Sequence, residues 1–150
     1  MDVLYLLDTN ILVHQVRRDA VGERIQKIYS PLLADPRPLI SVVTEGELRS
    51  LGFQLGWGQE KTDQAHFLLT YFQRTTIETE EILQAYALID TFSERMGRSM
   101  GKNDLWIAAT AHVTGATLLT TDKDFDHLEG QFLKREWIDP FAEKRSSSER

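Results

Sequence analysis

The segment from Val3 to Asn10 reads VLYLLDTN, an uninterrupted apolar run with an abrupt polar end. Five apolar residues in succession are typical of a strand that is buried on both faces of a parallel sheet, because such a strand has no solvent-facing side that polar residues would mark. Asp8 ends the run. We therefore expect a central strand that carries an acidic residue at its carboxyl end.

The residues that follow alternate between helical and strand patterns. Apolar positions recur at helical spacing from Asn10 to about Leu33, and Gly22 is expected to divide this stretch into two helices. The run from Leu39 to Val43 predicts a second strand, and a helix is expected from Thr44 toward Gly56. The pattern predicts strand-to-helix units.

The second half of the chain continues this alternation. In chain order we expect a helix over Gln59–Phe72, a short strand over Thr75–Ile77, an amphipathic helix through Ile82–Phe92, an alanine-rich helix over Asn103–Thr114, a strand over Thr117–Thr121 and an edge strand over Phe132–Ile138. Strands that alternate with helices predict an α/β domain with a mostly parallel sheet and right-handed crossovers.

The composition bounds the class of protein. A chain of 150 residues with 41% hydrophobic content is the size of one domain and can bury a core without disulfides. We expect a single domain over residues 1–140 and a flexible tail over 141–150, where the stretch from Lys144 to Arg150 is polar and contains three successive serines. Cysteine is absent, which excludes disulfides and thiolate metal sites.

The N-terminus and the net charge limit the cellular compartments and the kinds of nucleic-acid surface that we expect. The segment MDVLYLLDTN lacks the basic start and the cleavage site of a signal peptide, and Asp8 interrupts its apolar run. We expect no membrane segment and a cytoplasmic protein. The net charge of −6 argues against a broad nonspecific nucleic-acid surface, which clustered Lys and Arg would create. A small nuclease site is compatible with that charge.

Four acidic residues lie where the predicted elements would share an edge. Asp8 and Asp122 each end a predicted strand, and open parallel sheets hold their ligand sites at the carboxyl ends of strands. Glu47 lies one turn into the helix after the second strand, and Asp104 lies in the first turn of the alanine-rich helix. Carboxylates that converge repel one another unless protons or divalent cations compensate, and Mg²⁺ and Mn²⁺ prefer oxygen ligands. Convergence would therefore create a metal site.

Each of these acids also has an ordinary structural interpretation. Thr44-Glu45-Gly46-Glu47 has the spacing of a capping box, in which the last carboxylate binds the backbone amide of the threonine. The other three acids stand at the start of predicted helices or turns and would equally serve as N-caps or dipole partners. The residues alone leave both interpretations open.

Four motifs in a fixed order favour the functional interpretation. The segments are LLDTNIL at residues 6–12, SVVTEGEL at 41–48, GKNDLWIAA at 101–109 and LTTDKDF at 119–125. They resemble the motifs of PIN-domain proteins, and most of all those of VapC-type toxins of toxin–antitoxin pairs. The resemblance implies a three-layer α/β/α fold with a central, mostly parallel sheet and an acidic cleft that holds Mg²⁺ or Mn²⁺.

The resemblance also implies which residues act. It selects Asp8, Glu47, Asp104 and Asp122 as catalytic metal ligands for hydrolysis of RNA by a metal-activated water. Within the motifs, Glu45 competes with Glu47, and Asp124 competes with Asp122. Asn10 and Thr120 stand beside the acids and are expected to orient carboxylates or the water by hydrogen bonds, although turn formation would also explain them.

The implied partners are an RNA, for which a tRNA or rRNA is expected, a cognate antitoxin, and a second copy of the chain in a homodimer. Basic residues near the motifs are candidates for phosphate contacts: Arg17, Arg18, Arg49, Lys102 and Lys123. Apolar residues around the Gly-Trp-Gly break are candidates for a protein interface or for ordinary core packing: Phe53, Leu55, Trp57, Leu68, Leu69 and Phe72.

Two other functions fit parts of the sequence. The Asp8-Thr9-Asn10 segment loosely resembles phosphatases with an aspartate nucleophile, but Asn10 stands where their second aspartate would be. A noncatalytic PIN-fold module would bind RNA or protein without cutting it. The presence of all four acids favours an endoribonuclease over both alternatives.

Overall fold

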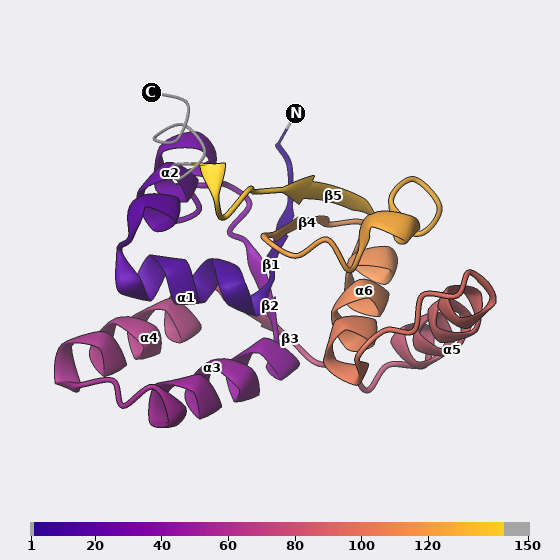
Figure 1. Cartoon of the computed structure of the whole chain (residues 1–150), viewed down its shortest axis with the longest axis horizontal. Coiled ribbons are helices and arrows are strands. Elements are labelled where there is room, and N and C mark those ends of the chain that lie inside the picture. The colour runs from indigo at the N-terminus through magenta and orange to yellow at the C-terminus, as the bar shows by residue number, and fades with distance from the viewer. Residues whose placement is uncertain (1, 143–150) are drawn as a thin grey trace.

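The centre of the protein is a five-stranded sheet in the order β3-β2-β1-β4-β5, with every neighbouring pair of strands parallel. The computed structural model describes residues 2–142 (Figure 1). The strands are β1 (Tyr5–Leu7), β2 (Leu39–Ser41), β3 (Gln73–Thr75), β4 (Thr117–Thr120) and β5 (Lys134–Trp137). The expected α/β class is confirmed, and the VLYLL run supplies the middle strand.

Helices cover both faces of this sheet. They are α1 (Thr9–Arg17), α2 (Ala20–Tyr29), α3 (Val42–Gln54), α4 (Gln59–Tyr71), α5 (Glu80–Arg95) and α6 (Lys102–Thr114), with a short 3₁₀ helix at Asp126–Leu128. Figure 1 shows α1 to α4 on one side of the strands and α5 with α6 on the other. This arrangement is the expected three-layer α/β/α architecture. No helix within the described residues is long and apolar enough to span a bilayer.

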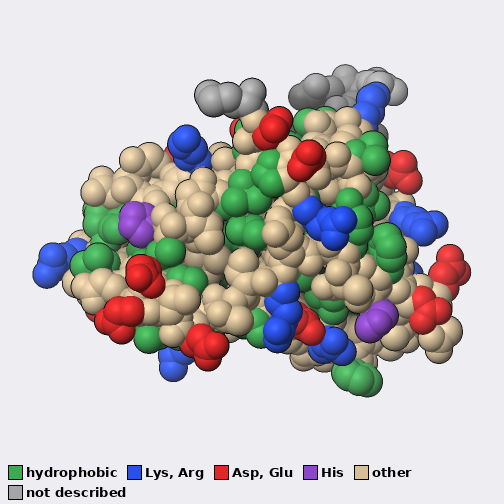
Figure 2. All heavy atoms as spheres, turned by 180° about the vertical axis from the view of Figure 1, so that it is seen from behind, with side chains coloured by type: hydrophobic (Ala, Val, Ile, Leu, Met, Phe, Trp, Pro, Cys, Tyr) green, Lys and Arg blue, Asp and Glu red, His purple; other side chains and the backbone are tan. Residues whose placement is uncertain are grey.

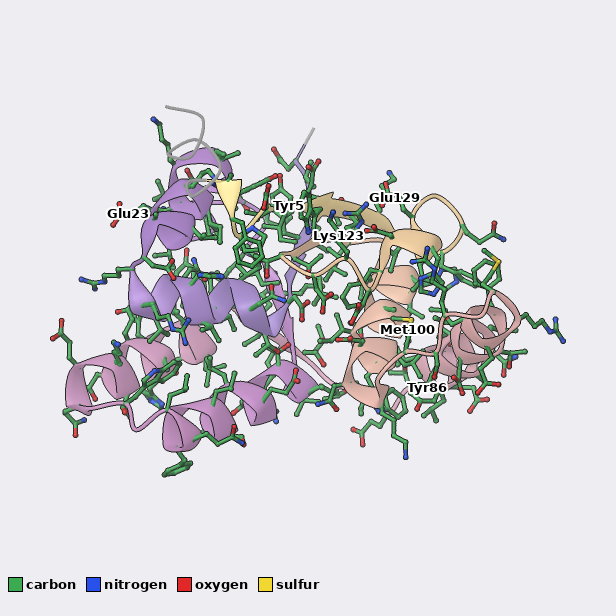
Figure 3. The ribbon with its side chains drawn as sticks, viewed as in Figure 1. Tyr5, Glu23, Tyr86, Met100, Lys123 and Glu129 are labelled. Carbon is green, nitrogen blue, oxygen red and sulfur yellow. The ribbon has the colours of Figure 1, made fainter. Side chains whose placement is uncertain are left out.

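The apolar run of β1 explains why the molecule has two cores. Successive residues of a strand point to opposite faces, and Leu6 accordingly packs with α5 and α6 whereas Leu7 packs with α1 to α4. Both leucines are fully buried. On the α5–α6 side, Tyr86 lies against Trp106 with ring centroids 4.1 Å apart and joins the two helices (Figure 3).

The strand order creates a natural position for a ligand site. The chain leaves β1 toward β2 on one side, and later returns to β4 on the other side of β1. The connections therefore diverge at the carboxyl ends of β1 and β4, which is where open α/β sheets form a crevice. Asp8 follows β1 directly, and its backbone N–H donates to the carbonyl oxygen of Leu119 at 3.0 Å.

The prediction that Gly22 separates two helices was wrong. The break lies at Arg18, whose φ of 53° is left-handed, and at Asp19, which caps α2 by accepting a hydrogen bond from the Gly22 N–H at 2.9 Å. Gly22 lies inside α2 because the two helices approach closely there: a Cβ on it would stand 2.3 Å from the His14 carbonyl oxygen. The glycine serves packing and not termination.

The second strand is shorter than expected, which removes the capping-box interpretation. Strand β2 ends at Ser41, because the Ser41 hydroxyl accepts a hydrogen bond from the Val43 N–H and starts α3 at Val42. Thr44 is thus inside the helix and does not cap it. Strand β3 occupies Gln73–Thr75 instead of the predicted Thr75–Ile77. The predicted tail from Lys144 onward lies outside the described residues.

The apolar residues considered for a protein interface differ in burial. Leu68 and Phe72 belong to the core that packs against α1 to α4, as ordinary packing would require. Phe53 is 88% exposed and Leu55 is 48% exposed at the end of α3. Trp57 and Leu69 are partly buried against the same core and line a groove together with Phe53, so these residues and Leu55 are available to a partner.

Candidate active site

The four acids singled out in the sequence line one hollow of about 370 Å³ at the diverging ends of β1 and β4. Asp8 comes from the end of β1, Glu47 from α3, Asp104 from α6 and Asp122 from the loop after β4. The other lining residues include Thr9, Asn10, Val13, His14, Arg17 and Leu51. Residues more than 110 positions apart in the chain therefore meet at one place.

Asp8 is the buried centre of this group. Its Oδ1 accepts a hydrogen bond from the Thr9 N–H at 2.8 Å, and its Oδ2 accepts from the Thr120 hydroxyl at 2.7 Å and the Asn10 amide at 3.1 Å. Burial, together with the charges of Glu47 and Asp122, raises the pKa of Asp8 to about 6 against the opposing effect of the hydrogen bonds. Asp8 is an N-cap and a member of the acid group at once.

Glu47 and Glu45 have different surroundings. The Glu47 carboxylate accepts hydrogen bonds from the Thr9 hydroxyl at 2.6 Å and from the Asn103 amide at 3.1 Å, and it lines the hollow. Glu45 instead accepts from Arg49 at 3.0 Å and Arg74 at 2.6 Å. Burial would raise the pKa of Glu45, but these two arginines hold it below its usual range. The structure thus places Glu47 in the hollow and Glu45 in a surface ion-pair network.

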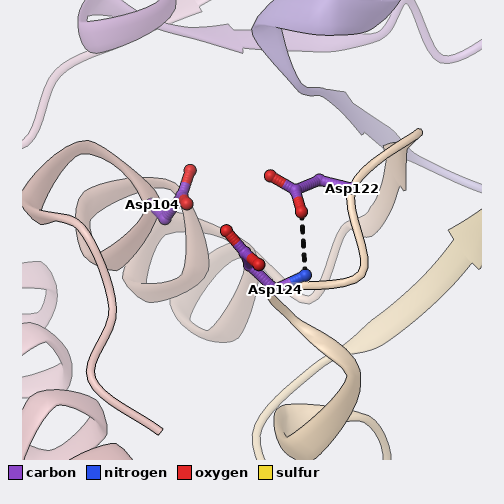
Figure 4. A group of neighbouring side chains, drawn as sticks. All are labelled: Asp104, Asp122 and Asp124. Atoms are coloured by element: carbon purple, nitrogen blue, oxygen red, sulfur yellow. Dashed lines mark hydrogen bonds between the residues drawn. The ribbon is translucent and has the colours of Figure 1, made fainter.

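Asp104 faces two aspartates of the loop that follows β4. One carboxylate oxygen from each of Asp104, Asp122 and Asp124 lies within 4.8 Å of the other two (Figure 4). The Asp124 N–H donates to Asp122 Oδ1 at 2.9 Å, which folds the loop so that both side chains reach Asp104. Burial raises the pKa of Asp104 to about 7, and the charges of Asp8, Asp122 and the other nearby acids add to this effect. Asp122 lines the hollow, and Asp124 lies at its exposed side.

The donor set of this hollow fits a hard divalent cation. No ion pair found among residues 2–142 engages any of the four acids. Converging carboxylate oxygens without sulfur ligands are the coordination that Mg²⁺ and Mn²⁺ prefer. The raised pKa values of Asp8 and Asp104 reflect the same unfavourable proximity and burial, which a bound cation would relieve.

The structure also shows supporting residues that the sequence did not single out. Thr9 and Asn103 hold the two oxygens of Glu47, and the side-chain Oδ1 of Asn10 accepts from the Thr121 N–H at 3.1 Å. Thr9 and Asn103 are immediate neighbours of Asp8 and Asp104 within the motifs. Because each is adjacent to a predicted metal ligand, the sequence could have indicated their supporting role. The expected contacts of Asn10 and Thr120 with the acid group are present in the structure.

Comparison with known proteins identifies one family. A family model described as PIN domain matches residues 5–131 of the chain. Ribonuclease VapC1 of Haemophilus influenzae strain R2866 is 32% identical over 129 residues, which cover 84% of this chain and 92% of that protein. The match thus spans nearly all of the relative.

Solved structures agree on the fold. The structure of VapBC-1 from nontypeable Haemophilus influenzae matches with a TM-score of 0.70 and 28% identity, over 91% of this chain and 98% of that one. VapBC2 from Rickettsia felis, bound to a DNA fragment from the promoter, matches with a TM-score of 0.74 and 21% identity, over 91% and 100% of the two chains. At 21% identity the second likeness supports the fold alone.

Proposed function

The chain belongs to the PIN-domain family, and from this premise we propose that it is a metal-dependent endoribonuclease, the toxin of a VapBC-type toxin–antitoxin pair. The observation that carries the proposal is the convergence of Asp8, Glu47, Asp104 and Asp122 on one hollow, where no ion pair found among residues 2–142 engages any of the four carboxylates. The similarity to a protein named Ribonuclease VapC1 supports RNA as the substrate class.

In this proposal the four acids hold Mg²⁺ or Mn²⁺ through their carboxylate oxygens. The bound ion would supply Lewis-acid stabilisation of the scissile phosphate and a lowered pKa for the attacking water. The remaining residues orient the ligands: Thr120 and Asn10 donate to Asp8, while Thr9 and Asn103 donate to Glu47. Such neighbours fix the direction of lone pairs and raise metal affinity.

Two further parts of the proposal concern extent and place. We assign the nuclease to a single domain over residues 1–140, since one sheet with a core on each face accounts for the described chain. A toxin that cuts tRNA or rRNA meets its substrate in the cytoplasm, and we place the protein there.

The basic residues near the motifs are not equivalent candidates for RNA contacts. Arg49 is engaged by Glu45, and the Lys123 ammonium lies over the Trp137 ring at 4.6 Å from its centroid. Arg17 lines the acid hollow. Figure 2 shows, on the face it presents, acidic and basic side chains interspersed, without a continuous basic surface. We therefore expect the protein to bind RNA through a few residues near the acids.

The groove between α3 and α4 is the surface that we assign to the antitoxin. It has a volume of about 480 Å³ and includes Phe53, Trp57 and Leu69 among its lining residues. Phe53 is 88% exposed, and with Trp57 and Leu69 it gives the groove an apolar surface of the kind that a protein partner covers. The VapBC complexes among the solved structures support an antitoxin partner. A homodimer is also part of the proposal, and light scattering of the purified chain tests it.

The nuclease proposal is tested by incubating the purified chain with a mixed pool of structured RNAs in Mg²⁺, Mn²⁺ or EDTA. We expect cleavage that EDTA abolishes and that Asp8→Asn eliminates while the protein stays folded. Glu47→Gln and Glu45→Gln form a matched pair, because each removes one acid from the same helix. The first should lose cleavage, and the second should retain it.

Other results would identify the rival functions. RNA retention without cuts by the metal-loaded chain would indicate a binding module. Covalent phosphorylation of Asp8 would indicate a phosphatase. If Glu45→Gln abolished cleavage and Glu47→Gln did not, the assignment of the metal ligands would be wrong.

A further inference from the structure

The hollow contains a second chemical feature besides its acids, at the end of α1. His14 lines the hollow, and its Nδ1 lies 2.8 Å from Asp19 Oδ2. Asp19 is itself anchored, because its Oδ1 accepts the Gly22 N–H at 2.9 Å. A carboxylate only accepts hydrogen bonds, so the Nδ1 of His14 carries a proton. The nitrogen left for a ligand is Nε2.

The close packing of α1 against α2 holds His14 and Asp19 rigidly. The side chain of His14 is only 17% exposed, and the helices approach so closely that a Cβ on Gly22 would stand 2.3 Å from the His14 carbonyl oxygen. Asp19 lies at the Nδ1 edge of the ring and does not line the hollow, whereas His14 does. The imidazole is therefore fixed at its Nδ1, on a residue that borders the hollow.

Arg17 adds a cation on the same side. It lines the hollow, its side chain is exposed, and none of the ion pairs found within residues 2–142 involves it. Basic residues are common at helix C-termini, where they interact with the helix dipole, and this alone would explain their presence at the end of α1. It does not explain why His14 and Arg17 both border the four acids. The hollow has an acidic part and a part that can attract anions.

Resting on the proposed nuclease function, we propose that His14 and Arg17 form a phosphate-binding subsite for the RNA backbone beside the scissile phosphodiester. The subsite requires the imidazolium form of His14, in which Nδ1–H donates to Asp19 and Nε2–H donates to a phosphate oxygen, and the Arg17 guanidinium donates to the same phosphate. Asp19 is a positioning residue. Contacts of this kind fix the register of a nucleic acid without reading its bases, so the subsite serves alignment of the strand with the acids.

The key variant is His14→Asn. The asparagine amide takes the place of the Nδ1–H and can still donate to Asp19, but nothing replaces Nε2. If the His14–Asp19 contact served only to pack α1 against α2, RNA binding would survive this change. If His14 is part of a phosphate subsite, RNA binding would weaken. Arg17→Gln removes the second donor group. Lys27→Gln is the matched control, because it removes one charge from an exposed position of α2.

Binding is measured by fluorescence anisotropy with a short labelled single-stranded RNA in Mg²⁺, in an Asp104→Asn background that is not expected to cut. We expect His14→Asn and Arg17→Gln each to raise the Kd roughly ten-fold, the loss typical of one charge-assisted hydrogen bond. Each should also reduce the slope of log K against log salt by about 0.7 if one phosphate contact is lost. Lys27→Gln should change neither quantity.

The outcomes separate this inference from the nuclease proposal. Metal-dependent cleavage by the unaltered chain is measured first, and its absence would remove the function on which the subsite rests. If the chain cuts RNA and His14→Asn and Arg17→Gln bind RNA like their background, the subsite is refuted and the nuclease stands. Loss of affinity with an unchanged melting temperature in His14→Asn supports the subsite; an equal loss in Lys27→Gln would refute its location.

Discussion

Asp104→Asn should stabilise the metal-free protein while abolishing its cleavage of RNA. Burial and the neighbouring acids raise the pKa of Asp104 from 3.8 to about 7, so its ionised form is unfavourable in the folded chain. A shift of about 3 units corresponds to roughly 4 kcal/mol at 1.36 kcal/mol per unit. Because Asp104 is only partly buried, solvent screens this interaction, and we expect a gain of about 1 to 2 kcal/mol.

The pH dependence of this gain follows from the sign of the shift. The folded pKa of about 7 exceeds the ordinary value of 3.8, so the folded chain keeps a proton that the unfolded chain has already released. The stability of the unaltered protein therefore falls as pH rises through this window. Asparagine carries no charge and avoids the penalty. The advantage of the variant should be complete above a pH of about 7 and vanish below 3.8.

The assay is thermal unfolding in EDTA at about pH 8, where a gain of 1 to 2 kcal/mol raises the Tm by ~2–8 °C for a domain of this size. Addition of Mn²⁺ should raise the Tm of the unaltered protein more than that of the variant, because binding to the folded state stabilises it. Glu94→Gln, at an exposed position of α5, is the control for loss of one charge. A variant that is no more stable than the unaltered chain in EDTA, or whose gain persists below 3.8, would refute the reasoning.

Two further substitutions test the packing and the support of the site. Gly22→Ala should destabilise the fold by about 2 to 4 kcal/mol in urea unfolding, because the added Cβ meets the His14 carbonyl oxygen at 2.3 Å. Gly46→Ala has nothing within 4 Å and should instead stabilise α3 by up to about 1 kcal/mol. Thr120→Val removes the hydroxyl that donates to Asp8 at 2.7 Å and should weaken Mn²⁺ binding ~10–100-fold by calorimetry, whereas an unchanged affinity would exclude the orienting role.

Local pattern was sufficient to predict the sheet, because burial on both faces leaves a direct mark on composition. The VLYLL run predicted a buried central strand, which forms over Tyr5–Leu7, and Leu6 and Leu7 enter opposite cores. The helix break was not predictable in the same way. A glycine inside a helical pattern usually predicts a helix end. At Gly22, glycine is instead required because a Cβ would clash with the His14 carbonyl oxygen of another helix. That reason lies in tertiary packing.

The candidate site was also predictable from local sequence only in part. The motifs selected Asp8 and Asp104 from local sequence, but the choice between Glu45 and Glu47 depended on residues far along the chain. Arg74 of β3 draws Glu45 to the surface, and Thr9 at the start of α1 holds Glu47 in the hollow. Two acids only two positions apart on one helix face different ways, and only their distant partners distinguish them.

Asp8 links the fold to the proposed chemistry. As the N-cap of α1, its carboxylate favours the helix, and as a buried group with a pKa of about 6 it opposes folding in its ionised form. An alanine or serine at this position would avoid the burial penalty, and serine would keep a cap. A helix cap alone therefore does not account for an aspartate here, whereas a cation ligand does, because a bound cation favours the ionised form that burial disfavours. We therefore expect a bound ion to offset the free-energy cost of burying the ionised Asp8 carboxylate.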